Sequence, residues 1–301
     1  MRKRRKKEKK PALILRLVRH YGWNPGRVAS EILEWIEVLA VAGILAFLVI
    51  SFVTVRMHVP TDSMWPTIDG DPSMLKADSF FVDMISYHFR RPKPGDIVVF
   101  WHTESILVKG IRDASLAARA GVSVGDKIVL INQEYVSAGA DEILASLPEG
   151  EPITLTLLKG SPAYQTESNL GPKPEGTPSL EDLGIVGREQ RVRYVKRLIA
   201  VGGEIVQIKD GHITIDGVRS ENPRFDREYL ANRPGVRFGA TPTLVPEGKW
   251  FLLGDNSQNS LDSRYWGFAD KTDFIGEPYF RVWPLGRFGP MNGYFSLHGE
   301  R

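Results

Sequence analysis

The chain has 301 residues, of which 42% are hydrophobic and 25% charged, which is enough to build a packed core. Its net charge of +3 conceals an asymmetry, because residues 1–30 contain eleven Lys and Arg against one acid, Glu8. That segment is therefore +10, and the rest of the chain is −7. Cysteine is absent, which excludes thiol catalysis. The six histidines are scattered, so we expect them to be surface or interface residues rather than metal ligands. Neither a metal nor another cofactor is expected.

The first predicted element is a membrane anchor. Residues 38–55 contain no charged side chain, and at about 1.5 Å per residue they are long enough to cross most of a hydrocarbon core. The apolar helix extends upstream, which places a single-pass transmembrane segment at 31–56. A cleavable signal peptide is disfavoured, because the run is too long and no small-residue cleavage site follows it.

The basic tail, residues 1–30, predicts the orientation of this anchor. Positive residues beside a membrane span stay on the cytoplasmic side and face anionic lipid. No RNA-binding motif follows, so membrane lipid is an expected partner and nucleic acid is not. We therefore expect a cell-membrane protein with a cytoplasmic N-terminus and an extracytoplasmic region after residue 56.

Strand signals dominate on both sides of a central segment. Residues 97–101 form an apolar β-prone run behind a Gly-Asp turn, and 249–253 form another. Between 205 and 218, Asp-Gly pairs at 210–211 and 216–217 predict two hairpin turns. We predict a mainly β fold with an antiparallel, partly barrel-like body. Its first part is 57–101, and its second part, with a C-terminal tail, is 191–301.

Residues 102–190 have the pattern of an inserted domain. A short helix at 114–122 leads into AGV-x-x-GD-x-I-x-x-I-N, followed by a second helix near 140–147 and a strand at 152–158. This order resembles the bacterial PDZ domain, which implies a small α+β domain with a peptide ligand. Residues 183–186, Leu-Gly-Ile-Val, resemble its carboxylate-binding loop and would complete the domain in permuted order. The Pro- and Gly-rich segment 161–178 predicts a flexible linker.

Three separated motifs carry the candidate chemistry. The first is TDSMWPT at 61–67, which places Ser63 on a turn just after the apolar run. The second is Lys196, whose apolar neighbours would lower its pKa by desolvation and so let it act as a base. The third is the polar loop GDNSQNSLDSRYWG at 254–267. Each motif alone is ordinary turn or surface chemistry.

Together, in this order and behind an anchor, the three motifs resemble the type I signal peptidase family of membrane-bound serine proteases. The resemblance covers about residues 38–101 and 191–284. It implies that Ser63 forms an acyl-enzyme, that Lys196 is its base, and that Ser260 orients the lysine amine. The Thr61 hydroxyl would join the Ser63 N–H as an oxyanion donor, although relatives carry serine or glycine at that position. Asp62, beside the nucleophile, is a second departure.

The resemblance also assigns structural support to the polar loop. Asp262 and Arg264 would form an ion pair that holds the loop, and Asp255 would add to that network. The expected function is removal of N-terminal signal peptides from exported preproteins, with the substrate bound as an extended strand beside a sheet edge. Two alternatives stay open: a soluble self-cleaving Ser/Lys protease of the repressor type, and a membrane-tethered PDZ-type adaptor with an inactive peptidase body. The anchor disfavours the former, and the intact Ser63, Lys196 and Ser260 disfavour the latter.

Overall fold

A computed structural model describes most of the chain and divides it into two compact units, 1–55 and 56–301. The residues it describes are 12–52, 54–85, 90–160, 162–176, 178–225 and 227–291. Residues 1–11 of the predicted basic tail and 292–301 of the predicted C-terminal tail lie outside this part of the chain.

The first unit contains two helices, α1 (Leu13–His20) and α2 (Arg27–Phe52). The Glu37 carboxylate on α2 accepts the N–H groups of Leu13 and Ile14 at 3.0 and 2.8 Å, which satisfies two of the otherwise free donors at the start of α1. Within the described residues, no helix combines the length and the apolar character needed to cross a membrane. The predicted span at 31–56 is therefore not confirmed.

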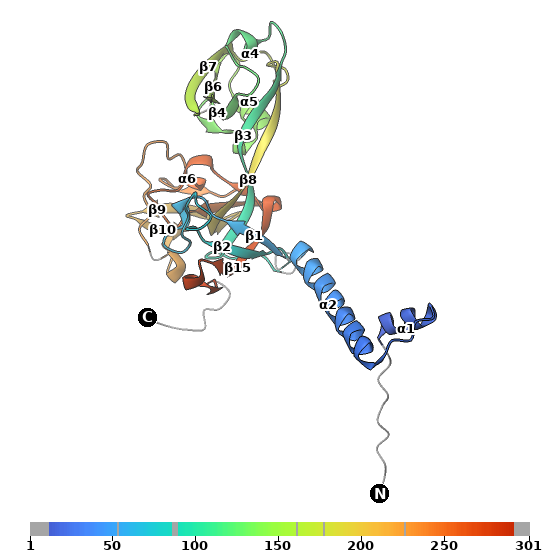
Figure 1. Ribbon diagram of the computed structural model, residues 1–301. Helices are drawn as coiled ribbons and strands as arrows, with labels where there is room; N and C mark the ends of the chain where they lie inside the picture. Colours follow the sequence, from blue (N-terminus) through green and yellow to red (C-terminus); the bar gives the residue numbers. More distant parts are fainter. Residues whose placement is uncertain are drawn as a thin grey trace. The chain divides into compact units, whose positions relative to one another are not determined.

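The second unit is built on antiparallel strands, which confirms the prediction of a mainly β body (Figure 1). The strands of its main sheet that lie outside the insertion, or run into it, are β1 (Thr54–His58), β2 (Ser79–Asp83), β3 (Ile97–Ile111), β8 (Ile185–Val201), β13 (Lys249–Leu253), β14 (Ala269–Asp270), β15 (Phe274–Trp283) and β16 (Gly289–Pro290). Short helical turns connect them: η1 (Asp62–Met64), η3 (Pro223–Phe225), α6 (Ser263–Trp266), η4 (Lys271–Asp273) and η5 (Leu285–Arg287).

A smaller antiparallel sheet in the same unit has the order β11 (Val218–Arg219), β10 (His212–Ile215), β9 (Ile205–Lys209), β12 (Thr243–Leu244). Both predicted hairpin turns are present. Asp210 and Asp216 have φ of 49° and 51°, and the glycine after each has φ of 79°. Two successive residues with positive φ match the right-handed twist of the flanking strands, which explains the Asp-Gly pairs.

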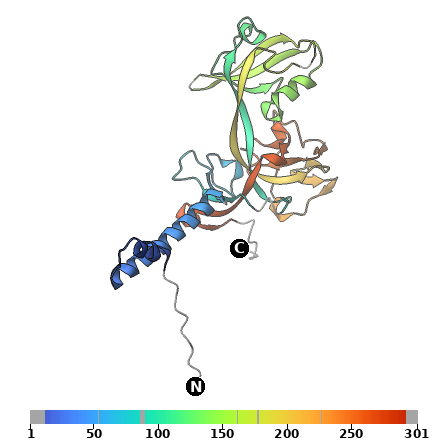
Figure 2. The same cartoon turned by 90° about the vertical axis from the view of Figure 1, so that its right-hand side faces the viewer.

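Strands β3 and β8 form one continuous antiparallel ribbon. Their register runs from the pair Ile97–Arg197 to the pair Ile111–Ile185, and Figures 1 and 2 show the two strands side by side throughout. On its other edge, β8 pairs with β13 only from Arg197 to Val201. The predicted domain limits at 101/102 and 190/191 therefore lie inside continuous strands, and the ribbon belongs to both the body and the insertion.

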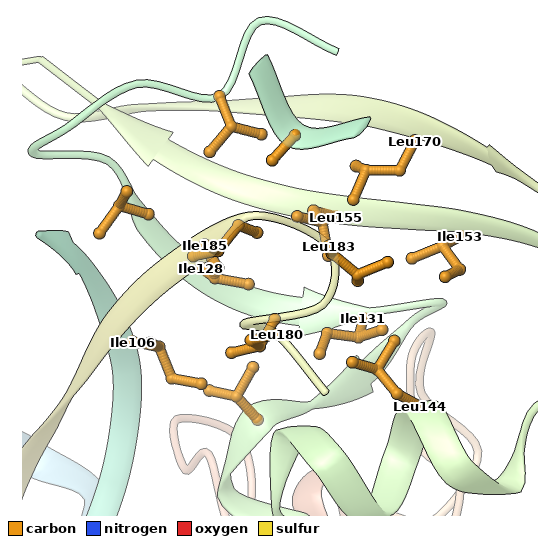
Figure 3. Packing of buried hydrophobic residues seen from close by; sticks show 14 of the residues in the cluster. Ile106, Ile128, Ile131, Leu144, Ile153, Leu155, Leu170, Leu180, Leu183 and Ile185 are labelled. Atoms are coloured by element: carbon orange, nitrogen blue, oxygen red, sulfur yellow. The ribbon is translucent and has the colours of Figure 1, made fainter. Parts of the chain in front are cut away.

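The insertion has its own apolar core (Figure 3). Its elements are α4 (Leu116–Arg119), β4 (Lys127–Ile131), β5 (Glu134–Tyr135), η2 (Val136–Ala138), α5 (Ala140–Ser146), β6 (Pro152–Lys159) and β7 (Tyr164–Pro172). Leu183 and Ile185, from the predicted loop segment 183–186, are buried in this core, and Leu183 O accepts the N–H of Ala117. The predicted helices and strands of the insertion are thus confirmed in position.

The predicted linker at 161–178 is wrong for residues 164–172, which form strand β7. Strand β7 pairs with β6 over its whole length, and Ser168 and Leu170 are buried. The Pro and Gly content indicated flexibility, but the hydrogen bonds to β6 hold this segment in an extended conformation. Local composition could not indicate that pairing.

The insertion also contacts the body beside the ribbon. Tyr135 packs against a cluster that includes Phe100 and Trp266. Arg237 of the body forms a 2.7 Å ion pair with Glu134. Strand β5 therefore lies next to the polar loop 254–267.

Candidate active site

Ser63 is largely buried and lies on η1, which begins at Asp62, a few residues after the end of β1 at His58. The turn is held from behind by Gly70, where an added Cβ would lie 1.7 Å from Thr61 O. The backbone at 70 can approach Thr61 only because it carries no side chain. The SMWPT segment is therefore folded back on itself, with the serine presented from a fixed turn.

The polar loop 254–267 is attached to the serine turn by its backbone. Asn256 N donates to Ser63 O at 3.0 Å, and Asn256 Nδ2 donates to Asp62 O at 3.1 Å. A Cβ on Gly254 would lie 2.5 Å from Ser63 O and 2.1 Å from Ser260 Oγ. The contacts of Asn256 and Gly254 were not predicted from the sequence, although the Gly-Asp-Asn run contains both residues.

Lys196 on β8 is buried, and its Nζ donates to Ser63 Oγ at 2.8 Å and to Val195 O at 3.1 Å. Burial lowers the pKa of Lys196 to about 8, while the carboxylates of Asp262 and Asp255 oppose this shift. The structure thus brings together two residues predicted from separate motifs. It also provides the apolar setting that a lysine base requires.

Aromatic side chains form one wall beside the lysine. The Tyr194 ring centroid lies 5.2 Å from Lys196 Nζ, and His102 stacks on Tyr194 with ring centroids 4.5 Å apart. The ring centroids of Trp266 and His102 are 4.8 Å apart, with the two rings tilted against each other. Burial lowers the pKa of His102 to about 3, so this histidine is neutral at physiological pH. The expectation of a surface position is wrong for His102, which is buried beside Phe100 and Trp266.

Asp262 and Arg264 form the predicted ion pair, with 2.8 Å between Oδ2 and Nη2 and both side chains fully buried. Asp262 also accepts the N–H of Gly254 at 3.0 Å, so it holds the first residue of the loop against its middle. Asp255 belongs to a different network. It accepts hydrogen bonds from Arg197 at 2.7 and 2.5 Å, pairs with Arg227 at 2.8 Å and is bonded to the Thr67 hydroxyl.

The two remaining predicted residues differ in what they contact. Thr61 Oγ1 lies 3.5 Å from Ser63 Oγ, beside the nucleophile. Ser260 Oγ is buried and has no hydrogen-bond partner among the described residues. The predicted bond between Ser260 and the lysine amine is therefore not formed here, because the described bonds of that amine go to Ser63 and to Val195 O.

A cleft of about 530 Å³ opens on the Ser63–Lys196 pair. One side is contributed by β1 and the turn after it, the other by β8, and a third by the polar loop. Its lining includes Met57, Val59, Thr61, Ser63, Glu104, Val192, Arg193, Tyr194, Val195, Lys196, Arg233, Ser260, Leu261 and Tyr265. Residues 192–196 of strand β8 border the cleft next to the candidate nucleophile.

Comparison with known proteins agrees with these motifs. The chain is similar to signal peptidase I of Leptolyngbya laminosa, 24% identical over 262 residues that cover 87% of this chain and 85% of the relative. For signal peptidase I of Mycobacterium tuberculosis strain H37Rv, the identity is 27% over 291 residues, with 90% and 79% covered. For signal peptidase I of Bacillus licheniformis, it is 37% over 147 residues, with 46% and 76% covered.

A crystal structure of a signal peptidase I from Enterococcus faecalis V583 overlaps 30% of this chain and 84% of its own, at 32% identity and a TM-score of 0.22. The family model described as signal peptidase, peptidase S26, matches residues 32–283, which is most of the chain. The chain therefore belongs to the signal peptidase family, peptidase S26, and is a peptidase of the signal peptidase I type.

Proposed function

We propose that the protein removes signal peptides from exported preproteins by acyl transfer to Ser63, with Lys196 as the general base. The observation that supports this most directly is the 2.8 Å contact between Nζ and Oγ in a buried setting. In the reaction, the neutral amine takes the Oγ proton while Oγ attacks the scissile carbonyl carbon. The ammonium then protonates the leaving amine, and an ester links Ser63 to the signal peptide.

The second half of the reaction uses the same groups. The deprotonated Lys196 takes a proton from water, the hydroxide oxygen attacks the ester carbonyl, and Ser63 Oγ leaves and recovers a proton from the ammonium. Ser63 N–H and the Thr61 hydroxyl are proposed to stabilise the oxyanion in both steps. The position of Thr61 Oγ1, 3.5 Å from Ser63 Oγ, supports this role.

Ser260 is proposed to accept a hydrogen bond from the ammonium form of Lys196. Its buried hydroxyl has no partner among the described residues, and a buried polar group without a partner is costly unless it is used. Asp262, Arg264 and Asp255 keep the polar loop and β8 in place around the dyad. None of these three is proposed to take part in proton transfer.

The substrate is proposed to bind as an extended segment along the cleft. Residues 192–196 of β8 would pair with its backbone, and the apolar side chains of Met57, Val59 and Val195 would border its side chains. Small side chains, typically alanine, would be accepted at the first and third positions before the scissile bond.

We further propose that residues 31–56 anchor the protein in the cell membrane, with lipid as a partner, the tail 1–30 cytoplasmic and the catalytic unit extracytoplasmic. The uncharged run at 38–55 and the +10 charge ahead of it support this. Protease accessibility in sealed vesicles tests the proposed orientation, and carbonate extraction tests the anchor. Release into the carbonate supernatant would contradict the anchor.

The assignment of residues 102–190 to a PDZ-like domain is also a proposal, supported by the positions of α4, β4, α5 and β6.

The alternative function, an adaptor with an inactive peptidase body, predicts that Ser63 does not react with an acylating inhibitor. A mechanism-based acylating inhibitor followed by peptide mass mapping should place the adduct on Ser63, and Lys196→Ala should prevent it. Absence of labelling in the folded wild-type protein would favour the adaptor.

A further inference from the structure

Strand β8 has one edge that is unpaired over most of its length. Its first edge pairs with β3 from Ile185 to Arg197, and its second edge pairs with β13 only from Arg197 onward. Among the described strands, none pairs with this second edge ahead of Arg197. Strand β13 ends at Leu253, so the second edge of β8 is open where the catalytic cleft begins.

The same edge borders two cavities. Residues 192–196 line the catalytic cleft, and residues 185–187 with Glu189 line a groove of about 490 Å³ in the insertion. An open strand edge presents N–H and C=O groups with which an extended peptide can pair. Because β8 is a single strand, its edge continues from residues 192–196 at the cleft to residues 185–189 at the groove. Figure 2 shows the course of this strand.

The groove is lined by acids. Asp141 and Glu142 lie in the first turn of α5, Glu181 lies in the turn ahead of β8, and Glu189 lies on β8. No Lys or Arg is among the described residues that line the groove. Asp141 is fixed in place, because its Oδ1 accepts the N–H of Leu180 at 3.0 Å. A concave surface with one sign of charge concentrates the opposite sign, so this groove favours Lys and Arg side chains.

In the loop beside the groove, three successive backbone N–H groups that could bind a terminal carboxylate are already used. The N–H groups of Leu183, Gly184 and Ile185 donate to carbonyls of residues 179–181, at 3.3, 2.9 and 2.9 Å. A carboxylate bound there would need those N–H groups and would also face the acids of the groove. The ligand that fits is therefore an internal segment of a chain.

We propose that the open edge of β8 carries the substrate from the catalytic cleft into this acidic groove, which binds an extended segment rich in Lys or Arg on one side of the scissile bond. This rests on the proposed function. Glu189 lies seven positions before Lys196 and Val186 lies ten, which is about 23 to 33 Å at ~3.3 Å per residue. The basic segment therefore lies roughly 7 to 10 residues from the cleaved bond. The groove lies at only one end of this edge. We therefore expect a preference for Lys or Arg on one side of the scissile bond and not on the other.

Cleavage of three soluble peptides with the same scissile sequence tests this proposal. One has neutral flanks, one has a Lys cluster 7 to 10 residues before the bond, and one has the cluster the same distance after it. Several ion pairs at an exposed groove should raise kcat/KM about tenfold for one Lys peptide only. Equal preference for both Lys peptides, or for neither, would overturn the proposal.

Matched charge variants test whether the acids of the groove cause the preference for a Lys peptide. In Glu142→Gln/Glu181→Gln/Glu189→Gln, the ratio of kcat/KM between the preferred Lys peptide and the neutral peptide should fall to about one. The control Glu149→Gln/Glu151→Gln/Glu167→Gln removes the same charge from exposed positions outside the groove and should keep the wild-type ratio. A retained ratio in the groove variant, or an equal loss in the control, would refute the site. If the wild-type protein cleaves none of the peptides, the proposed function itself fails.

Pairing between the peptide backbone and β8 is tested by measuring the affinity of the labelled Lys peptide for Ser63→Ala protein by fluorescence anisotropy. In a β pairing, every second N–H of the ligand points to the partner strand, so N-methylation of alternate residues should weaken binding in one register and spare the other. Ending the Lys segment in a free carboxylate rather than an amide should give no gain in affinity. Equal effects in both registers, or tighter binding of the free acid, would contradict the strand-edge mode.

Discussion

Arg197 and Asp255 form a two-point ion pair, with Nε–Oδ1 and Nη2–Oδ2 distances of 2.7 and 2.5 Å and both side chains buried. Because successive side chains of a strand point to opposite faces, this pair lies across β8 from Lys196. Asp255 is also bonded to the hydroxyl of Thr67, which ends the SMWPT segment. One carboxylate therefore fixes the strand of the candidate base and the turn of the candidate nucleophile together.

Asp255→Asn should destabilise the protein by about 3 to 5 kcal/mol, because it leaves the Arg197 charge buried without its partner. Chemical denaturation of the full chain in detergent measures this. The control is Lys249→Gln, which breaks an exposed pair with Asp270 and should cost less than about 1 kcal/mol. Equal effects of the two substitutions would mean that the buried pair does not hold β8.

Ser63→Ala and Lys196→Ala should each lower the cleavage rate by on the order of 10⁴-fold or more while the protein stays folded. The reason is that either change removes the nucleophile or its base. Lys209→Ala, at an exposed position on β9, is the matched lysine control and should cleave at the wild-type rate. Turnover within tenfold of wild type in either variant would contradict the assignment of Ser63 as the nucleophile and Lys196 as its base.

The pH dependence of kcat/KM should show an ascending limb with an apparent pKa of about 8, because only the neutral amine of Lys196 accepts the Ser63 proton. Initial rates on a short soluble peptide between pH 6 and pH 10 measure it. A flat profile between pH 6 and pH 9 would count decisively against a lysine base.

Lys196→Met should stabilise the protein at pH 7. Burial lowers the pKa of Lys196 from 10.5 unfolded to about 8 folded, so the unfolded state binds more protons between these values and stability rises with pH across that window. Below pH 8 the full penalty applies, at about 1.4 kcal/mol per pKa unit or about 3 kcal/mol in total. Denaturation midpoints of Lys196→Met and of the wild-type protein at pH 7 and pH 10.5 measure the gain in stability. A gain of the same size at both pH values would show that lost charge is not its cause.

Replacing residues 112–184 by Asn-Gly should preserve cleavage of a short soluble peptide to within about tenfold, because Ile111 and Ile185 already pair and can be joined by a hairpin turn. Thr61, Ser63, Lys196 and Ser260 all lie outside the removed segment. A moderate loss is expected, since the contacts of Glu134 and Tyr135 with the body disappear. A folded variant without turnover would place the insertion inside the active site.

Local features were predictable wherever neighbours in sequence decide the conformation. The Asp-Gly turns at 210–211 and 216–217 need positive φ, and the structure has it at both. The helices and strands of the insertion followed from patterns of apolar residues. Strand β7 did not, because its extended conformation depends on hydrogen bonds to β6 rather than on its own Pro- and Gly-rich residues.

The three motifs, the mainly β body and the residue types of a Ser/Lys site could be predicted from the sequence, because these are properties of short segments. Three features of the site could not: Lys196 lies against Ser63, which is 133 residues away in the chain, Asp255 pairs with Arg197, and Ser260 has no partner among the described residues. Such contacts depend on the register of β3 against β8 and on the path of the chain after β13. Register and path are set by pairing between distant segments, and no local pattern encodes which strand a given edge will meet.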